Sequence, residues 1–341
     1  MRVLITGGAG FIGCNLADAS IRAGHDVTLF DNLSRRGSQA NLAWLESFHG
    51  CQRLHFVRGD IRDYAAIRAA AGGQQVIYHL AAQTAVTTSV TEPRPDFEIN
   101  ALGTFNVLEA AREAGDDPIF IFSSTNKVYG GMEDSPAQEL ATRYVLPHYP
   151  DGVDEARPLD FHSPYGCSKG AADQYVRDYA RIYGLRSVVF RQSCIYGQRQ
   201  MGVEDQGWVA WFIIAAVTGK PITIYGNGKQ VRDLLHVDDL VRAFLVATDK
   251  IGVAAGQVYN LGGGPANTLA IWAEFQPLLC EVLGRPVEAA AQAGWRPGDQ
   301  PVFVADVRKA GRDLGWAPQI GVREGITRLA AWVKENRNLF T

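Results

Sequence analysis

The sequence predicts an α/β fold in which a doubly wound parallel sheet is joined to a smaller, discontinuous, mixed α/β domain. Two observations lead to this prediction. From residue 2 to residue 123, short apolar runs alternate with stretches of helical length and periodicity. A glycine-rich stretch, residues 7–13, directly follows the first apolar run, where such a fold turns from strand into helix.

The first strand, turn and helix are expected over residues 2–23. Gly7, Gly10 and Gly13 follow the strand at GxxGxxG spacing, and Gly8 with the last two also satisfies GxGxxG. Glycines allow a tight turn and a close approach of the backbone to a pyrophosphate, and the free N–H groups of the new helix bind phosphate. The stretch predicts a dinucleotide site of the Rossmann type; a purely structural glycine turn is the alternative.

The second strand, residues 26–30, is followed by Asp31, near the spacing of about 20 residues expected for the acid that binds the adenosine ribose. Its carboxylate would accept hydrogen bonds from the ribose hydroxyls and repel a 2′-phosphate. Arginines just beyond the strand, here Arg35 and Arg36, are how NADP is accommodated, although a solvated loop is their simpler interpretation. Because the Asp31 carboxylate would repel the 2′-phosphate, we expect NAD rather than NADP.

Three further strands are expected, over residues 54–57, 76–80 and 119–123, with a long helix over 100–112. Asp60 follows the first of these strands. It is expected either to meet the adenine edge or to cap the helix that begins near residue 63. Ligands of a doubly wound sheet bind at the carboxyl ends of the strands.

A hydroxyl-rich cluster, Ser123, Ser124 and Thr125, leaves the fifth strand at that edge. Tyr165 and Lys169 lie at i and i+4, on one face of a helix. A neighbouring ammonium lowers the pKa of a phenol and so makes Tyr165 a usable base, with Thr125 donating to the same substrate hydroxyl. The alternative is an exposed pair without a function.

The composition is that of an ordinary globular protein, 47% hydrophobic and 20% charged, with a formal net charge of −3. This balance argues against nucleic acid or a membrane surface as partner. We expect no signal peptide, and an apolar run at 208–217 that is too short to span a bilayer and forms a buried helix. Five scattered cysteines indicate reduced thiols in a cytoplasm and no metal site.

The second half of the sequence carries arginines suited to a pyrophosphate: Arg199, Arg232 and Arg296. Surface ion pairs are the alternative for each of them. The irregular segment 131–163 is expected to form part of a substrate-pocket wall, with disorder as the alternative. His236 and Asp238 are expected to be structural. Two helices of the smaller domain are expected, over residues 272–283 and 325–336.

Four motifs together resemble the extended short-chain dehydrogenase/reductase family of NAD-dependent nucleotide-sugar epimerases and dehydratases. They are TGGxGFxG at 6–13, HLAAQ at 79–83, SST…VYG at 123–130 and YxxxK at 165–169. The resemblance is strongest to one branch of 2-epimerases, on the segments 30–37, 96–100, 123–130, 159–175, 205–212 and 226–233.

Two departures from the wider family narrow the activity. Dehydratases of this family carry an acidic pair directly after the threonine, where this sequence has Asn126 and Lys127, so elimination would lack its acid and base. The RPxNVYG segment of 4-epimerases reads RQSCIYG at 191–197, which puts simple 4-epimerase behaviour in doubt.

The resemblance implies epimerisation at C2 of a CDP-linked dideoxyhexose, interconverting paratose and tyvelose through a 2-keto intermediate. It also implies O-antigen lipopolysaccharide synthesis, a cytoplasmic location and a homo-oligomer (dimer or tetramer). The alternatives are a UDP-hexose 4-epimerase, a net dehydrogenase or reductase, and a non-catalytic NAD-binding regulator.

The site residues expected on this basis form three sets. The catalytic residues are Tyr165, Lys169, Thr125 and Ser124. The NAD-binding residues are Gly7, Gly10, Phe11, Ile12, Gly13, Asp31, Asn32, Ser34, Arg35, Asp60, Ile61, Leu80, Ala81, Ala82, Gln83, Asn100, Ser123, Tyr165, Lys169 and Gln192. The substrate-binding residues are Gln83, Thr125, Asn126, Ser193, Cys194, Arg199, Gln206, Arg232 and Arg296.

Two domains are expected. The NAD-binding domain comprises residues 1–190 with about 231–260 and 301–312. The nucleotide-sugar domain comprises 191–230, 261–300 and 313–341.

Overall fold

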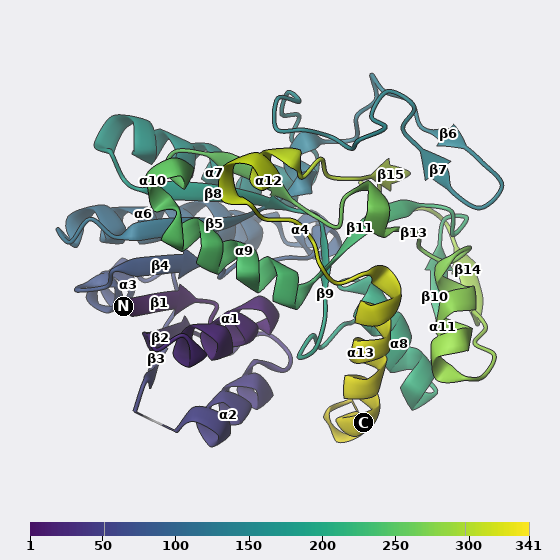
Figure 1. Ribbon diagram of the computed structural model, residues 1–341, viewed down its shortest axis with the longest axis horizontal. Coiled ribbons are helices and arrows are strands. Elements are labelled where there is room, and N and C mark those ends of the chain that lie inside the picture. Colours follow the sequence, from purple (N-terminus) through teal and green to yellow (C-terminus); the bar gives the residue numbers. More distant parts are fainter. Residues whose placement is uncertain (51, 297, 341) are drawn as a thin grey trace.

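A seven-stranded parallel sheet forms the centre of the computed structural model, which describes residues 1–50, 52–296 and 298–340 (Figure 1). The strand order is β12-β8-β5-β4-β1-β2-β3, so the direction of winding reverses between β1 and β4. This confirms the predicted doubly wound sheet. The strands are β1 (Arg2–Thr6), β2 (Asp26–Asp31), β3 (Leu54–Arg58), β4 (Val76–His79), β5 (Ile119–Thr125), β8 (Ser187–Gln192) and β12 (Val258–Leu261).

Helices cover both faces of this sheet, which explains why its strands are apolar at consecutive positions. In β1, Val3 and Ile5 belong to one buried cluster and Leu4 to another. The first cluster is completed by α1 (Phe11–Arg22), α2 (Ser38–His49), α9 (Val237–Asp249), α10 (Ile251–Ala254) and α12 (Arg308–Leu314). The second is completed by α3 (Tyr64–Ala71), α6 (Gly103–Glu113) and α7 (Ser163–Tyr183).

Two helices begin differently from the prediction, one because of its capping residue and one because it starts with a π-helical turn. Asp63, not Asp60, caps α3, because its carboxylate accepts from the main-chain N–H of Ala66. The helix predicted over 100–112 follows α4 (Val86–Thr91) and α5 (Pro93–Phe97) and begins with the π-helical turn η1 (Glu98–Leu102). Asn100 lies in that turn and is fully hydrogen-bonded in the interior.

A second core lies beside the sheet, around the predicted buried helix, which forms as α8 (Trp208–Thr218) (Figure 1). It packs against α11 (Phe275–Leu283) and α13 (Val322–Glu335). Two small sheets adjoin it. The first contains β10 (Thr223–Tyr225) and β14 (Ala291–Ala293), and the second β9 (Cys194–Tyr196), β11 (Val231–His236), β13 (Thr268–Ala270) and β15 (Val302–Phe303). The domain division stays a prediction, although β11, which we placed in the NAD-binding part, lies in the second small sheet.

The segment 131–163 packs on its own apolar cluster rather than around a cavity. It includes β6 (Gln138–Glu139) and β7 (Tyr144–Val145), and its Met132 and Val153 are buried against Phe303. None of its residues lines either of the two cavities described below. The predicted role as a pocket wall is therefore wrong, because these apolar residues face Phe303 and each other.

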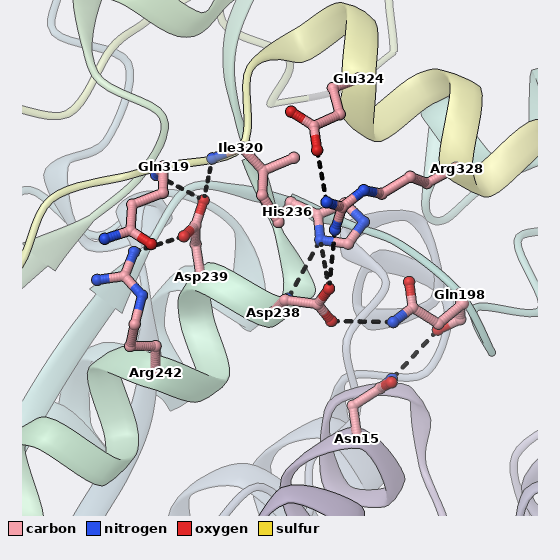
Figure 2. A network of polar contacts seen from close by, with 10 residues as sticks. All are labelled: Asn15, Gln198, His236, Asp238, Asp239, Arg242, Gln319, Ile320, Glu324 and Arg328. Atoms are coloured by element: carbon pink, nitrogen blue, oxygen red, sulfur yellow. Dashed lines mark hydrogen bonds and ion pairs between the residues drawn. The ribbon is translucent and has the colours of Figure 1, made fainter.

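The predicted structural role of His236 and Asp238 is confirmed at the start of α9 (Figure 2). The His236 ring accepts from the main-chain N–H of Asp238, 3.3 Å away. The Asp238 carboxylate accepts from Gln198 at 2.9 Å and from Arg328 of α13 at 3.4 Å. The network fastens α13 and the segment at 198 to α9. In the part of the chain that the structure describes, no helix is long and apolar enough to cross a membrane.

Candidate active site

The first cavity opens at the carboxyl edge of the sheet, where the strand order reverses. This is where a doubly wound sheet binds its ligand. It is lined by 14 of the residues predicted to bind cofactor: Gly7, Gly10, Phe11, Ile12, Gly13, Asp31, Asn32, Ser34, Arg35, Asp60, Ile61, Leu80, Ala81 and Ala82. Its other lining residues include Arg36, Thr84, Ile99 and the segment around Arg199, Gln200, Met201 and Gln206.

The glycine turn forms a cradle of main chain that side chains would fill. Gly7 has a φ of +68°, and a Cβ there would lie 2.8 Å from the nitrogen of Ala81. A Cβ on Gly13 would lie 2.3 Å from the oxygen of Gly7. No side chain caps the start of α1 at Gly10. The bare turn and the uncapped helix of 12 residues fit the pyrophosphate of a dinucleotide.

Asp31 is held at the end of β2 by main-chain N–H groups. Its carboxylate accepts from Ala9 at 3.1 Å and from Leu33 at 2.7 Å, and burial raises its pKa. The side chain is thus fixed at the position that reads the ribose hydroxyls of a dinucleotide. Beyond it, Asn32 donates to Asp60 at 3.0 Å, and hydrogen bonds from Arg62 lower the pKa of Asp60 to about 2.

A segment from the second half of the chain forms the opposite wall of this cavity. Asn15 donates to the main-chain oxygen of Gln198 at 3.1 Å, as Figure 2 shows, and Asn41 donates to that of Arg199 at 3.4 Å. Arg35 donates to Gln206 at 3.0 Å. We call residues 198–206, fastened in this way to α1, α2 and the loop after β2, the bridging segment.

Arg199 lines the first cavity and not the second, so the structure does not bring it together with Arg232 and Arg296. Its guanidinium lies over the ring of Trp44, 3.0 Å from the ring centroid, in a residue with a φ of +67°. This cation–π contact holds the guanidinium against Trp44, while its Nε has no hydrogen-bond partner among the described residues.

The predicted base and its hydrogen-bond donor meet at the carboxyl end of β5. The Thr125 side chain lies close enough to the Tyr165 phenol to lower its pKa, and both residues are buried. The start of α7 is anchored because the main-chain N–H of Tyr165 donates to the Ser89 hydroxyl at 3.1 Å. Burial raises the pKa of Tyr165 to about 12, against the opposing effect of Thr125.

The lowered pKa that we predicted for Tyr165 is thus wrong for the protein without ligands. Lys169 donates to the main-chain oxygen of Ser123 at 2.6 Å, and its ammonium lies 4.2 Å from the ring centre of Phe122. Burial lowers the pKa of Lys169 to about 7. Desolvation therefore dominates the pKa of both Tyr165 and Lys169. The Lys169 ammonium donates to a main-chain carbonyl rather than to the phenol.

Ser124 points to the interior, so its predicted catalytic role is wrong. Its hydroxyl donates to Asp173 at 2.8 Å, and Asp173 forms a fully buried ion pair with Arg191 at 2.9 Å. Because successive side chains of a strand alternate between faces, Thr125 and Ser124 cannot both face the site. Ser124 instead completes the hydrogen bonds of the ion pair.

Gln83 and Asn100 bind each other rather than facing a ligand. Asn100 donates to Asp96 at 3.1 Å and to the main-chain oxygen of Gln83 at 3.1 Å, and the Gln83 amide donates to Asp96 at 2.8 Å. Their predicted contacts with NAD, and that of Gln83 with substrate, are therefore corrected to a scaffolding role. Gln192 differs, because its buried Nε2 has no partner among the described residues and can donate to a ligand.

The second cavity adjoins the first, since Thr84 and Gln206 line both. Of the predicted substrate residues, Gln206, Arg232 and Arg296 line it. Thr125 and Asn126 are buried beside it, at the chain positions just before Lys127. The lining also includes residues that were not predicted, namely Lys127, Glu204, Asp205, Trp208, Phe212, Thr223, Tyr225, Ile271, Gly298 and Asp299.

Ser193 and Cys194 do not line the second cavity, contrary to prediction. The Ser193 hydroxyl donates to the buried carboxylate of Asp233. Burial raises the pKa of the Cys194 thiol to about 12. Ser193, just before β9, and Cys194, within it, thus point into the protein interior and not into the second cavity. Lys127 could have been predicted from its place in the motif that follows Thr125. No motif in the sequence marks Glu204, Asp205 or Asp299 as lining residues.

Residues 3–262 match the model of the family described as "NAD dependent epimerase/dehydratase family". The chain is 45% identical to the CDP-paratose 2-epimerase of Salmonella typhi, over 97% of this chain and 99% of that protein. It is 33% identical to a putative UDP-glucose 4-epimerase of Methanocaldococcus jannaschii, over 98% and 99% of the two chains.

Solved structures are also similar to this chain over nearly its full length. A UDP-glucose 4-epimerase of Thermotoga maritima, solved with UDP-glucose, gives a TM-score of 0.84 at 31% identity over 99% of this chain and 100% of that one. The dTDP-glucose 4,6-dehydratase DesIV of Streptomyces venezuelae, solved with NAD bound, gives 0.85 at 31% identity, over 99% and 98%.

Fold and site together define an NAD-dependent enzyme with a Rossmann-type sheet. The chain belongs to the NAD dependent epimerase/dehydratase family, as its motifs indicated. Its cofactor is NAD, for which the glycine cradle and the Asp31 carboxylate are suited.

Proposed function

We propose that the protein inverts C2 of a CDP-linked dideoxyhexose, interconverting CDP-paratose and CDP-tyvelose. The observation that carries this proposal is the 45% identity, over nearly both full lengths, to a CDP-paratose 2-epimerase. The turn after Thr125 supports an epimerase over a dehydratase. An amide and an ammonium, Asn126 and Lys127, stand there in place of the carboxylates that elimination needs.

Proton transfer is assigned to Tyr165. When bound, NAD supplies the chemistry of accepting and returning a hydride. The Tyr165 oxygen takes the proton of the C2 hydroxyl as the C2–H bond breaks, so that a 2-keto sugar forms. Thr125, a neighbour of the phenol, would donate to the same substrate oxygen and so keep it aligned with Tyr165. Tyr165 then returns the proton to the oxygen after the hydride has been added to the opposite face of the ketone.

The phenol must lose its raised pKa for this step. Lys169 lies one helical turn from Tyr165 and carries a positive charge in its protonated form. A charged ammonium and an oxidised nicotinamide both favour the phenolate. We therefore assign Lys169 the role of lowering the pKa of Tyr165 in the loaded enzyme, in addition to holding the ribose of the cofactor.

The second cavity is assigned to the nucleotide diphosphate. Arg232 and Arg296 are forked cations that bind phosphate in a bidentate manner. A substrate held there by its diphosphate stays bound while the sugar releases its own contacts and turns over between the two hydride transfers. Inversion needs such a turn, because the hydride has to reach both faces of C2.

Incubation of the purified protein with CDP-paratose or CDP-tyvelose, without added NAD and followed by proton NMR, tests the proposal. We expect one sugar to convert into the other. A second candidate, UDP-hexose 4-epimerisation, is favoured by the UDP-glucose 4-epimerases among the relatives. Interconversion of UDP-glucose and UDP-galactose, with no reaction of the CDP sugars, would establish that activity instead.

We also propose that two copies pair through α6 and α7, within a dimer or tetramer. Phe105 of α6 and Tyr175 of α7 are exposed and in edge-to-face contact, and Ile182 and Tyr183 continue the apolar surface. Phe105→Asp should give a smaller species in light scattering. A cytoplasmic location and a part in O-antigen lipopolysaccharide synthesis complete the proposal.

A further inference from the structure

The second cavity has three cationic side chains, and they differ in how their charge is balanced. Arg232 forms an ion pair with Asp299 at 2.5 Å, and Arg296 forms one with Asp205 at 3.2 Å. Lys127 has none within 4.0 Å among the residues that the structure describes. Its ammonium donates to two uncharged oxygens, the main-chain oxygen of Gly298 and the side chain of Gln300, each at 3.2 Å.

Lys127 is also tied to the reacting end of the site. It lies in the 3₁₀ turn η2 (Asn126–Tyr129), and its main-chain N–H donates to the Thr125 hydroxyl at 3.3 Å. The Thr125 side chain is in turn a neighbour of the Tyr165 phenol, whose pKa it lowers. An ammonium has three donors, of which two are occupied, so one remains for a ligand.

We propose that Lys127 binds a hydroxyl of the sugar that does not react and thereby holds the ring so that the C2 hydroxyl lies against Tyr165. This inference rests on the proposed function. Lys127 is then a positioning residue that selects the carbon at which epimerisation occurs. A hydrogen bond from a charged donor in a buried site is strong enough to decide between two orientations of one ring.

The charge state of Lys127 suits this role. Burial and the nearby Arg232 guanidinium lower its pKa to about 8, and Asp299 opposes them. The side chain is therefore mostly protonated at neutral pH. The alternative role is a purely structural one, in which Lys127 does no more than hold residues 298–300, and with them Asp299, against the turn.

The experiment compares Lys127→Met with a matched control, Lys334→Met, at an exposed lysine of α13. Two quantities are measured for each: kcat/KM for CDP-paratose, and the dissociation constant of CDP, which has no sugar. We expect kcat/KM of Lys127→Met to fall about 10- to 100-fold, the usual effect of one charged hydrogen bond. The affinity for CDP should change less than about twofold, since the arginines remain.

A structural role predicts the opposite pattern. If residues 298–300 lose their place, the Arg232–Asp299 pair is disturbed, and CDP affinity falls together with kcat/KM. That result, or an unchanged kcat/KM, overturns the inference. Lys127→Gln, which keeps a donor for Gly298 without the charge, provides a second variant if the methionine variant does not fold, and the same two patterns decide.

The two proposals fail in different ways. If the unmodified protein does not convert CDP-paratose, the proposed function is wrong. If it does convert CDP-paratose, and Lys127→Met converts it equally well, only the inference about Lys127 is wrong.

Discussion

The two cavities differ in the chemical groups that line them. Main chain forms the floor of the first, in the turn of residues 7–13 and at Ala81, and of its two carboxylates, Asp31 and Asp60, the first is fixed by backbone N–H groups. Charged side chains form the second, in ion pairs such as Arg232–Asp299 that join distant parts of the chain. The first is set by steric limits on a few consecutive residues, and the second by electrostatic pairing, so each should fail separately.

The largest effect is expected at Tyr165, the proposed proton acceptor. Tyr165→Phe removes the proton acceptor, and we expect kcat to fall about 10³-fold or more, in the range of general acid–base catalysis. Bound NAD and the affinity for CDP should be retained, because the ring and its packing remain. NMR assays and ultraviolet absorbance of the purified variant check this. An active variant would mean that another group carries the proton.

The next effect separates the first cavity from the second. In Gly13→Ala the new Cβ would lie 2.3 Å from the Gly7 oxygen, so the turn must move. We expect no NAD to remain after purification and a stability loss of about 1–3 kcal/mol, as for overpacking elsewhere. CDP affinity, measured by calorimetry, should stay within about threefold if each cavity fails separately, because the effects of changes at independent sites add without coupling.

Gly252→Ala is the matched control for that change. This glycine is exposed in α10 with open space around its Cβ position. Alanine there should leave NAD content unchanged and stabilise the helix by up to about 1 kcal/mol. Loss of NAD in both variants would show that the cradle is not what retains the cofactor.

The converse change acts on the second cavity. Arg232→Met removes one forked cation, and we expect CDP to bind about 10- to 100-fold more weakly, the size of a charged hydrogen-bond pair. NAD content should be unchanged. Arg94→Met, at an exposed arginine of α5, is the control. Equal losses of NAD and CDP in Arg232→Met would show that the cavities are one cooperative unit.

The smallest effect concerns pH. Lys127 is protonated below its pKa of about 8 and loses its charge above it, so kcat/KM for the sugar substrate should decline by less than about tenfold as pH rises from 7 to 9. Lys127→Arg keeps its charge over this range. The ratio of kcat/KM between wild type and this variant should therefore fall with pH, whereas titration of Lys169 cancels from the ratio. A constant ratio would contradict the assignment.

The sequence was informative where neighbours along the chain decide the structure. The strand at residues 2–6, the glycine turn and Asp31 at the end of β2 depend on local geometry, and all lie where predicted. Tyr165 and Thr125 were also predicted together, because both follow from known strand and helix periodicities. Most of the cofactor cavity was therefore visible in advance.

Predictions failed where a distant partner decides what a side chain does. Ser124 turns to Asp173, Arg199 stacks on Trp44, and Gln83 binds Asp96. None of these partners is adjacent in sequence. The raised pKa of Tyr165 has the same origin, because the degree of burial depends on the packing of the whole site and not on the spacing to Lys169.

The bridging segment, residues 198–206, has a consequence for how the enzyme depends on the NAD of the cell. It is fastened to α1 and α2 by Asn15 and Asn41, and to the loop after β2 by Arg35. A cofactor lying behind this segment would stay bound from one turnover to the next. Because each turnover returns the hydride that it removes, we expect the reaction rate to be indifferent to the balance of oxidised and reduced NAD in the cell.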